Sequence, residues 1–295
     1  MVMIRVTQNM VTGRSLTSLQ AGLDRLAQTQ EKLSTGKNLN RPSDSPTDAT
    51  TSMKIRVQLA ETQQHVRNAQ NGLGWLDVTD STLSGMADNL RRVSELALQG
   101  ANASITGSTS TALATEVAQI REGLLAQANT TYLDRPIFGG VTAGTQAFDA
   151  SGAYVGADAP VQRSVADGVK VRIDVSGTTV VGPNGDNLFD DLAALESALR
   201  LGDKAGIQAG IAAVTERQRA VSDAQAAVGA SYNRADAAER KGQDALVTLR
   251  SALSEVEDTD LPKAMVDLQM HEVAYQAALA STARVMQPSL VDFLR

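Results

Sequence analysis

The sequence predicts a mainly α-helical fold, an elongated antiparallel long-helix bundle with paired terminal helices and a small β-rich insertion. Two segments of roughly 50 residues repeat apolar positions at alternating steps of three and four, the period of an amphipathic helix. Aromatic residues make up only 3% of the 295 residues, which suits thin helices packed through small side chains. The segments also follow a palindromic order of short helix, break, long helix, insertion, long helix, break and short helix.

The first short helix is predicted within residues 1–35. It carries a narrow heptad-like stripe of leucines, namely Leu16, Leu19, Leu23, Leu26 and Leu33. Residues 34–48 then break the helix through Gly36, Pro42 and Pro46. Ser45 or Asp48 is a suitable N-cap for the helix that follows.

The first long helix is predicted over residues 48–100. Its stripe runs from Leu59 to Ala97 and includes Asp80, and we expect Gly72 and Gly74 to bend it. A shorter helix is predicted over residues 112–130.

The middle of the chain, residues 136–185, predicts a small β-rich insertion. Val169, Val171, Ile173 and Val175 alternate with polar residues, the pattern of a strand with one buried face. The sequence Pro-Asn-Gly at 183–185 predicts a turn.

Helices resume after Asp186 or Asn187, and the second long helix extends from about residue 204 to residue 256. The apolar phase then slips by one residue, and Asp258 or Asp260 can cap a separate terminal helix. That helix carries a second stripe, continued by an apolar chain end. Its residues are Leu261, Met265, Leu268, Tyr275, Leu279, Met286, Leu290, Phe293 and Leu294.

Three domains follow from this order. Residues 1–40 with 258–295 form a terminal helical assembly domain, and residues 41–135 with 186–257 form a long-helix bundle. Residues 136–185 form a small β-rich domain that faces outward. Two long helices of matched length most simply pack antiparallel, which brings the termini together and predicts a rod.

The two terminal stripes together form what we call the assembly seam. One interpretation is a two-helix hairpin docked on the protein's own core. Because an isolated pair of thin helices is marginally stable, we favour neighbouring copies as the missing cover. Residues 1–35 and 261–295 are then expected to be disordered or protease-sensitive in the isolated monomer.

Little in the sequence predicts chemistry. There is no cysteine, which excludes disulfides and thiolate sites, and the net charge of −6 argues against nucleic-acid binding. No window is apolar enough for a membrane span, and no signal peptide for the general secretory route is expected. His65 and His271 are interpreted as surface or seam residues.

Two further groups of residues have the composition of a binding site. Gly139, Gly140 and Gly144 resemble a phosphate loop, but Thr145 stands where the lysine is required, so a turn is favoured. An acidic cluster indicates either a cation site or helix capping, and capping is favoured because the spacing does not match an EF-hand; its members are Glu255, Glu257, Asp258 and Asp260. No catalytic, cofactor or metal site is therefore predicted. An enzyme with its site in the β insertion is the alternative from a different class.

Several phrases, in this order and spacing, resemble the flagellin superfamily of bacterial flagella, and within it the hook-filament junction family. At the N-terminal side they are RVTQNM (5–10), KLSTGK (32–37), RPSDSPTDA (41–49), ALQGAN (97–102) and IFGG (137–140). Towards the C-terminus they are NLFDDL (187–192), EDTDLPKA (257–264), YQAALA (275–280) and PSLVDFLR (288–295). The similarity covers both terminal thirds.

The resemblance implies a structural protein that polymerises through its terminal helices and joins the hook-associated region to the flagellin filament. It further implies export through the flagellar type III apparatus and a cytoplasmic chaperone on the C-terminal region. Its partners would be other copies, an adjacent hook-associated protein and flagellin. Flagellin itself is the alternative identity, although IFGG, NLFDDL and LVDFLR favour the junction family.

Overall fold

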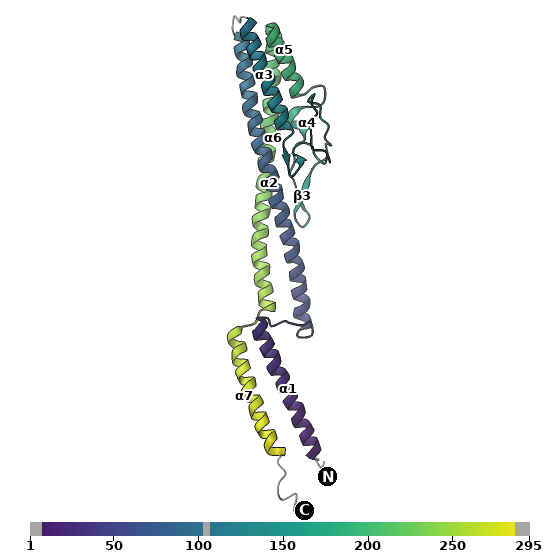
Figure 1. Cartoon of the computed structure of the whole chain (residues 1–295), viewed down its shortest axis with the longest axis vertical. Helices are drawn as coiled ribbons and strands as arrows, with labels where there is room; N and C mark the ends of the chain where they lie inside the picture. Colours follow the sequence, from purple (N-terminus) through teal and green to yellow (C-terminus); the bar gives the residue numbers. More distant parts are fainter. Residues whose placement is uncertain (1–7, 103–106, 287–295) are drawn as a thin grey trace, which may run out of the picture. The chain divides into compact units, whose positions relative to one another are not determined.

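A computed structural model describes residues 8–102 and 107–286 (Figure 1). Seven helices occur within these ranges: α1 (Gln8–Thr35), α2 (Pro46–Asn102), α3 (Gly107–Ala128), α4 (Gly177–Val181), α5 (Leu188–Leu201), α6 (Lys204–Glu257) and α7 (Leu261–Met286). The mainly helical fold with a small β insertion is confirmed. The chain divides into two compact units, Met1–Ala60 with Val247–Arg295, and Glu61–Leu246. These units are grouped differently from the three predicted domains, which stay a prediction.

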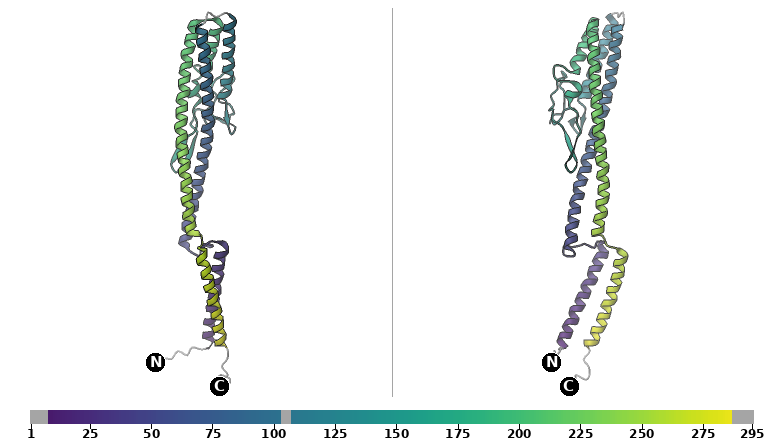
Figure 2. Two further views of the ribbon diagram at one scale, coloured as in Figure 1. Left: turned by 90° about the vertical axis from the view of Figure 1, so that its left-hand side faces the viewer. Right: turned by 180° about the vertical axis from the view of Figure 1, so that it is seen from behind.

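The larger unit is a helical bundle in which α2 and α6 run antiparallel. Gln70 donates a hydrogen bond to Glu239 at 3.0 Å, and Gln218 donates one to Ser94 at 3.1 Å, so residue numbers rise on one helix as they fall on the other. Helices α3 and α5 pack together beside them (Figures 1 and 2). The core is built from leucines and valines of all four helices, among them Leu76, Leu83, Leu90, Leu124, Leu192, Leu195, Val214 and Val221.

One predicted core position on α2 is wrong. The stripe placed Asp80 on the buried side, but Asp80 is exposed and Thr79 is fully buried. The buried Thr79 hydroxyl donates a hydrogen bond to the backbone oxygen of Trp75 at 2.9 Å, so its polar group is paired. The stripe marked only one edge of the buried face, because within the bundle α2 also buries residues outside it such as Met86 and Val93.

The β insertion consists of two small antiparallel strand pairs. Strand β1 (Thr131–Tyr132) pairs with β2 (Arg135–Pro136), and β3 (Gln162–Ala166) pairs with β4 (Val169–Arg172). The predicted alternation over 169–175 holds in the middle, where Val171 and Ile173 are buried, but Val169 is half exposed and Asp174 is buried. Asp174 is tolerated there because its carboxylate accepts hydrogen bonds from the Val161 amide at 2.7 Å and from Arg172.

Gly72 and Gly74 mark the place where the insertion packs on α2, which continues through both as one helix. A Cβ on Gly74 would meet the hydroxyl of Tyr132, and one on Gly72 would approach Ile173 at 3.1 Å. The two glycines therefore allow a close approach of side chains of the insertion to the helix backbone.

The predicted caps are observed where they can be checked. The Asn187 side chain accepts hydrogen bonds from the amides of Phe189 and Asp190 at the start of α5. Ser45 accepts from the Asp48 amide at 3.4 Å at the start of α2. Asp260 accepts from the Lys263 amide at 3.2 Å and caps α7.

The insertion provides a test of backbone strain with a matched control. Gly140 (φ 60°) and Gly168 (φ 66°) both adopt the left-handed conformation, but only Gly140 is crowded, because its Cβ would overlap the carbonyl oxygen of Ala157. We expect G168A to cost about 1 kcal/mol of stability and G140A at least about 2 kcal/mol more. Urea unfolding followed by the fluorescence of the single tryptophan, Trp75, measures both. Equal losses for the two variants would contradict the packing assigned to Gly140.

Candidate assembly surface

Within the smaller unit, α1 and α7 lie side by side and run antiparallel (Figures 1 and 2). Their packing is close at Gly22, where an added Cβ would touch the ring of Tyr275 at 3.4 Å. We call these two helices the terminal helix pair.

The residues of α1 that pack against α7 coincide with the predicted stripe at Leu19, Leu26 and Leu33. At the other positions they lie one residue before it. This packed side of α1 combines three leucines with three small residues, in the order Ser15, Leu19, Gly22, Leu26, Thr29 and Leu33. The packed side of α7 has the same character, with Ala264, Leu268, His271, Tyr275, Ala278 and Thr282. The small residues at these positions let the two helix backbones approach each other. The contact therefore contains these small residues, and the leucines next to them in the sequence lie outside it.

The structure therefore divides the predicted assembly seam. Leu19, Leu26, Leu33, Leu268 and Tyr275 are partly buried inside the terminal helix pair. The other five described side chains are between 44% and 57% exposed; we call them the apolar face, and they are Leu16, Leu23, Leu261, Met265 and Leu279. The side chain of Met286, and residues Leu290, Phe293 and Leu294, lie outside the described part of the chain.

The five exposed residues lie on one side of the pair. Leu16 and Leu23 follow the packed residues Ser15 and Gly22 by one position, and Met265 and Leu279 follow packed alanines in the same way. One position turns a helix by about 100°. Because the helices run in opposite directions, the same turn on each brings both sets to the same side.

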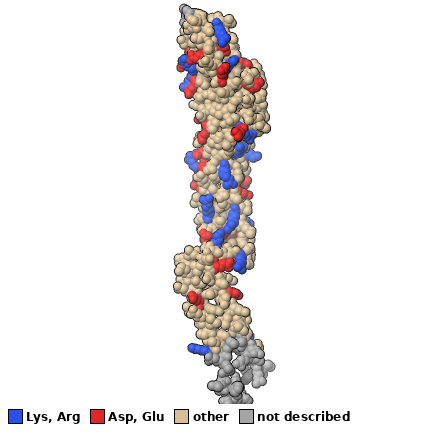
Figure 3. Space-filling view, in the orientation of Figure 1, with Lys and Arg blue, Asp and Glu red and all other residues tan. Residues whose placement is uncertain are grey.

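The opposite side of the pair is polar. A groove between the two helices is lined there by Arg25 and Lys32 of α1 and by Lys263, Asp267 and His271 of α7. The view in Figure 3 shows fewer charged side chains over α1 and α7 than over α2 and α6. The terminal helix pair thus has one polar side and one uncovered apolar side.

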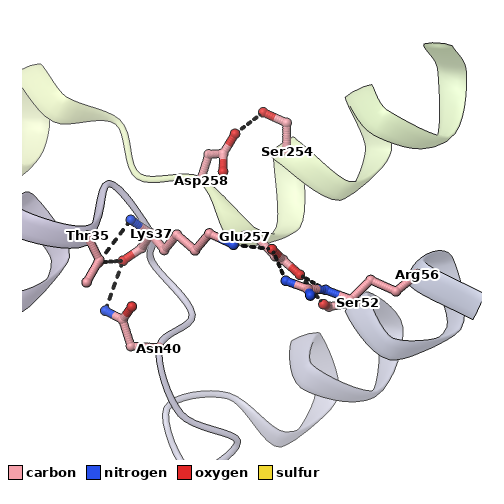
Figure 4. Close-up of polar contacts among 8 residues, drawn as sticks. All are labelled: Thr35, Lys37, Asn40, Ser52, Arg56, Ser254, Glu257 and Asp258. Atoms are coloured by element: carbon pink, nitrogen blue, oxygen red, sulfur yellow. Dashed lines mark hydrogen bonds and ion pairs between the residues drawn. The ribbon is translucent and has the colours of Figure 1, made fainter. Parts of the chain in front are cut away.

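The ends of α1, α2, α6 and α7 meet at a buried carboxylate, Glu257 (Figure 4). Arg56 of α2 donates to both of its oxygens, through Nε at 2.7 Å and through a terminal nitrogen at 2.8 Å. Lys37 donates at 3.0 Å, and the hydroxyl of Ser52 also contacts the carboxylate. We call these four residues the clamp.

Backbone hydrogen bonds hold the same place together. Asn38 donates its amide to the Glu257 carbonyl at 2.7 Å, and Thr259 donates to the Gly36 carbonyl at 2.9 Å. The linkers that lead into α2 and α7 are therefore paired as a short antiparallel bridge between Lys37 and Asp258. This bridge fixes where α1 ends and α7 begins.

The clamp lowers the pKa of Glu257 from 4.5 to about 2. The largest cause is the hydrogen bonding from Arg56, and the hydrogen bonds from Ser52 and Lys37 act in the same direction against the opposing effect of burial. Glu257 is therefore charged at every pH at which the protein would normally work.

Sequence reasoning missed the clamp. The predicted capping role of the acidic cluster is confirmed for Asp260 and is wrong for Glu257, which accepts the hydrogen bonds of the clamp. The partners Lys37, Ser52 and Arg56 lie about 200 residues away in the chain, so no local spacing could indicate them.

The other candidate groups are accounted for by the fold. His65 contacts the backbone oxygen of Ser164 through Nδ1 at 3.2 Å, and Gly140 bridges Ala157 in the insertion. In residues 8–102 and 107–286, no cluster of His, Asp and Glu is arranged to hold a metal ion. Across the same ranges, no helix combines the length and apolarity needed to cross a bilayer.

Long amphipathic helices that bury a shared core and leave an apolar face exposed are typical of structural proteins that contact other chains. Residues 6–142 match the bacterial flagellin N-terminal helical region, and residues 211–294 match the bacterial flagellin C-terminal helical region. These regions together span well over half of the chain. The chain belongs to the bacterial flagellin family and is a structural component of the bacterial flagellum, where such proteins oligomerise.

Individual relatives fall into two groups. The chain is 25% identical over 285 residues to a flagellin of Halalkalibacterium halodurans, which covers 96% of each chain. It is 28% identical over 166 residues to flagellar hook-associated protein 3 of Escherichia coli, which covers 56% of this chain and 50% of that protein. The crystal structure of flagellar hook associated protein-3 from Legionella pneumophila shares the fold, with a TM-score of 0.62 at 14% identity over 69% of this chain and 98% of that one.

The clamp predicts a specific dependence of stability on pH. A depressed carboxyl pKa contributes stability that is complete above the unfolded pKa near 4.5 and is lost as pH falls towards 2. We expect a loss on the order of 2–3 kcal/mol across this window. Hydrogen-exchange protection of the Asn38 and Thr259 amides reports it locally.

The variant E257Q should lack this dependence and should show weakened protection already at pH 7. E255Q is the control, because it removes an equal charge from an exposed site two residues away. Protection at these amides that fell equally in both variants would contradict the role assigned to Glu257.

Proposed function

We propose that this protein is the junction component between the hook-associated region and the flagellin filament, assembled through its terminal helix pair. The observation that carries the proposal is the apolar face, which α1 and α7 leave uncovered although they pack against each other. Five half-exposed leucine and methionine side chains on one side of a helix pair indicate a contact with another chain.

Three observations favour the junction over the filament. The phrases IFGG, NLFDDL and LVDFLR resemble the junction family, and the fold is shared with a hook-associated protein 3. The insertion is also small. Flagellin itself remains the second candidate, favoured by its similarity along 96% of the chain.

We also propose the partners of this protein and the route by which it is exported. The neighbours would be further copies, an adjacent hook-associated protein on one side and flagellin on the other. A cytoplasmic chaperone would cover the exposed apolar residues of α7 before assembly. A chain without cysteine can be threaded unfolded, which suits export by the flagellar type III route to the outside of the cell.

Deletion of the gene separates the two candidates. If the protein is the junction component, cells keep their hooks and release unpolymerised flagellin into the medium. If it is flagellin, the released filament protein itself disappears. Electron microscopy of the cells, with immunoblotting of the medium for flagellin, gives the answer.

Charges on the apolar face test the surface directly. The double variant M265E/L279E should reduce filament attachment to the level of the deletion strain, because burying two carboxylates in an apolar contact is strongly unfavourable. Both positions are exposed in the subunit, so helix content by circular dichroism should stay unchanged. L201E is the control, because Leu201 is 83% exposed and lies outside the terminal helix pair. Normal swimming of M265E/L279E would show that this face is not an assembly surface.

A further inference from the structure

Helix α7 exposes a second apolar surface that the periodicity of the sequence did not reveal. Val266, Met270 and Val273 are between 58% and 65% exposed, which is more than any residue of the apolar face. We call these three residues the outer stripe. They follow each other by four and three positions and so lie along one line of the helix.

The outer stripe points away from α1. The packed residues Ala264, His271 and Ala278 mark the side of α7 that faces α1. At about 100° per residue, the outer stripe lies on the far side of the helix from them, roughly a third of a turn from the apolar face. One neighbouring helix can cover either surface, but not both.

The charges beside the two surfaces are opposite. Lys263 and Arg284 are exposed next to the outer stripe, whereas Glu272 is exposed in the middle of the α7 part of the apolar face. Opposite charges at matching apolar surfaces favour contact between them and disfavour contact of either surface with itself.

We propose that the outer stripe of one copy docks on the apolar face of the next copy of this chain. The inference rests on the proposed assembly through the terminal helix pair and names the surface that each neighbour supplies. Because the two halves of the contact differ, it is heterologous and does not close as a dimer. Repetition of such a contact produces a ring or a helical layer.

A second copy is the occupant that the molecule favours for two reasons. Each chain carries both halves of the contact, with complementary charge, within a single helix pair. Proteins of this family also oligomerise within the flagellum. Any different partner protein would have to supply an equivalent surface of its own.

The chain contains no cysteine, so cross-linking can test the pairing without background. L279C marks the apolar face and V273C marks the outer stripe. Flagella isolated from cells that express both single-cysteine chains, treated with a short bismaleimide, should shift a large part of this protein from monomer to dimer on a denaturing gel. Flagella carrying either single variant alone should show no dimer.

Two controls make every outcome decisive. The variant G22C/Y275C places both cysteines in the contact between α1 and α7, so its intrachain cross-link shows that the reagent reaches the helices. Recovery of each single-cysteine chain in isolated flagella, by immunoblotting, shows that it is assembled. With reagent access shown, dimers formed by L279C alone, or no dimers in the mixed flagella, would overturn the proposed pairing.

Immunogold labelling of the flagella distinguishes an incorrect junction role from an incorrect pairing of the two surfaces. If the protein were the filament subunit, immunogold labelling would mark the whole filament, yet the mixed flagella would still yield the cross-linked dimer. If labelling is confined to the hook-filament boundary and the dimer is absent, the junction role stands and the pairing does not.

Discussion

The smaller unit depends on one buried carboxylate. Glu257 receives hydrogen bonds from Lys37, Ser52 and Arg56, and these groups belong to the linker after α1, to α2 and to the end of α6. A buried charge with three donors is tolerated, whereas the same carboxylate without its cationic partners Lys37 and Arg56 would be strongly destabilising. The interaction therefore requires all of these segments to be in place together, and it sets the points from which α1 and α7 extend.

Beyond the clamp, small residues decide how the terminal helices pack. Ser15, Gly22 and Ala278 lie in the contact, and larger leucines next to them are left half exposed. If the seam consisted only of leucines that faced each other, all of them would be buried in the contact between α1 and α7 of one chain. Dividing the apolar side chains between the inner contact and the open face lets one helix pair fold within the subunit and still retain surface for a neighbour.

Much of the fold could be predicted from periodicity, because amphipathic helices carry their period in the local sequence. The long helices and the caps Ser45, Asn187 and Asp260 lie where the sequence predicts them. The same pattern does not show which side of a stripe packs against another helix. It therefore predicts a buried Asp80, and it does not distinguish the exposed Leu16 from the partly buried Leu19. It gave no sign of the clamp, whose members are neighbours only after folding, and it overlooked the outer stripe because those residues lie outside the main repeat.

The place where the insertion meets α2 has a consequence for the evolution of the chain. Gly72 and Gly74 leave a patch of bare helix backbone, and Tyr132 and Ile173 rest on it. The shape of helix backbone does not depend on the sequence of the insertion. The contact at this patch therefore requires little of the insertion beyond an aromatic ring and a branched side chain at the right spacing. At this patch α2 can therefore accept changes in the insertion without changing itself, whereas beside it the insertion is bonded to the side chains of Asn68 and Asn71.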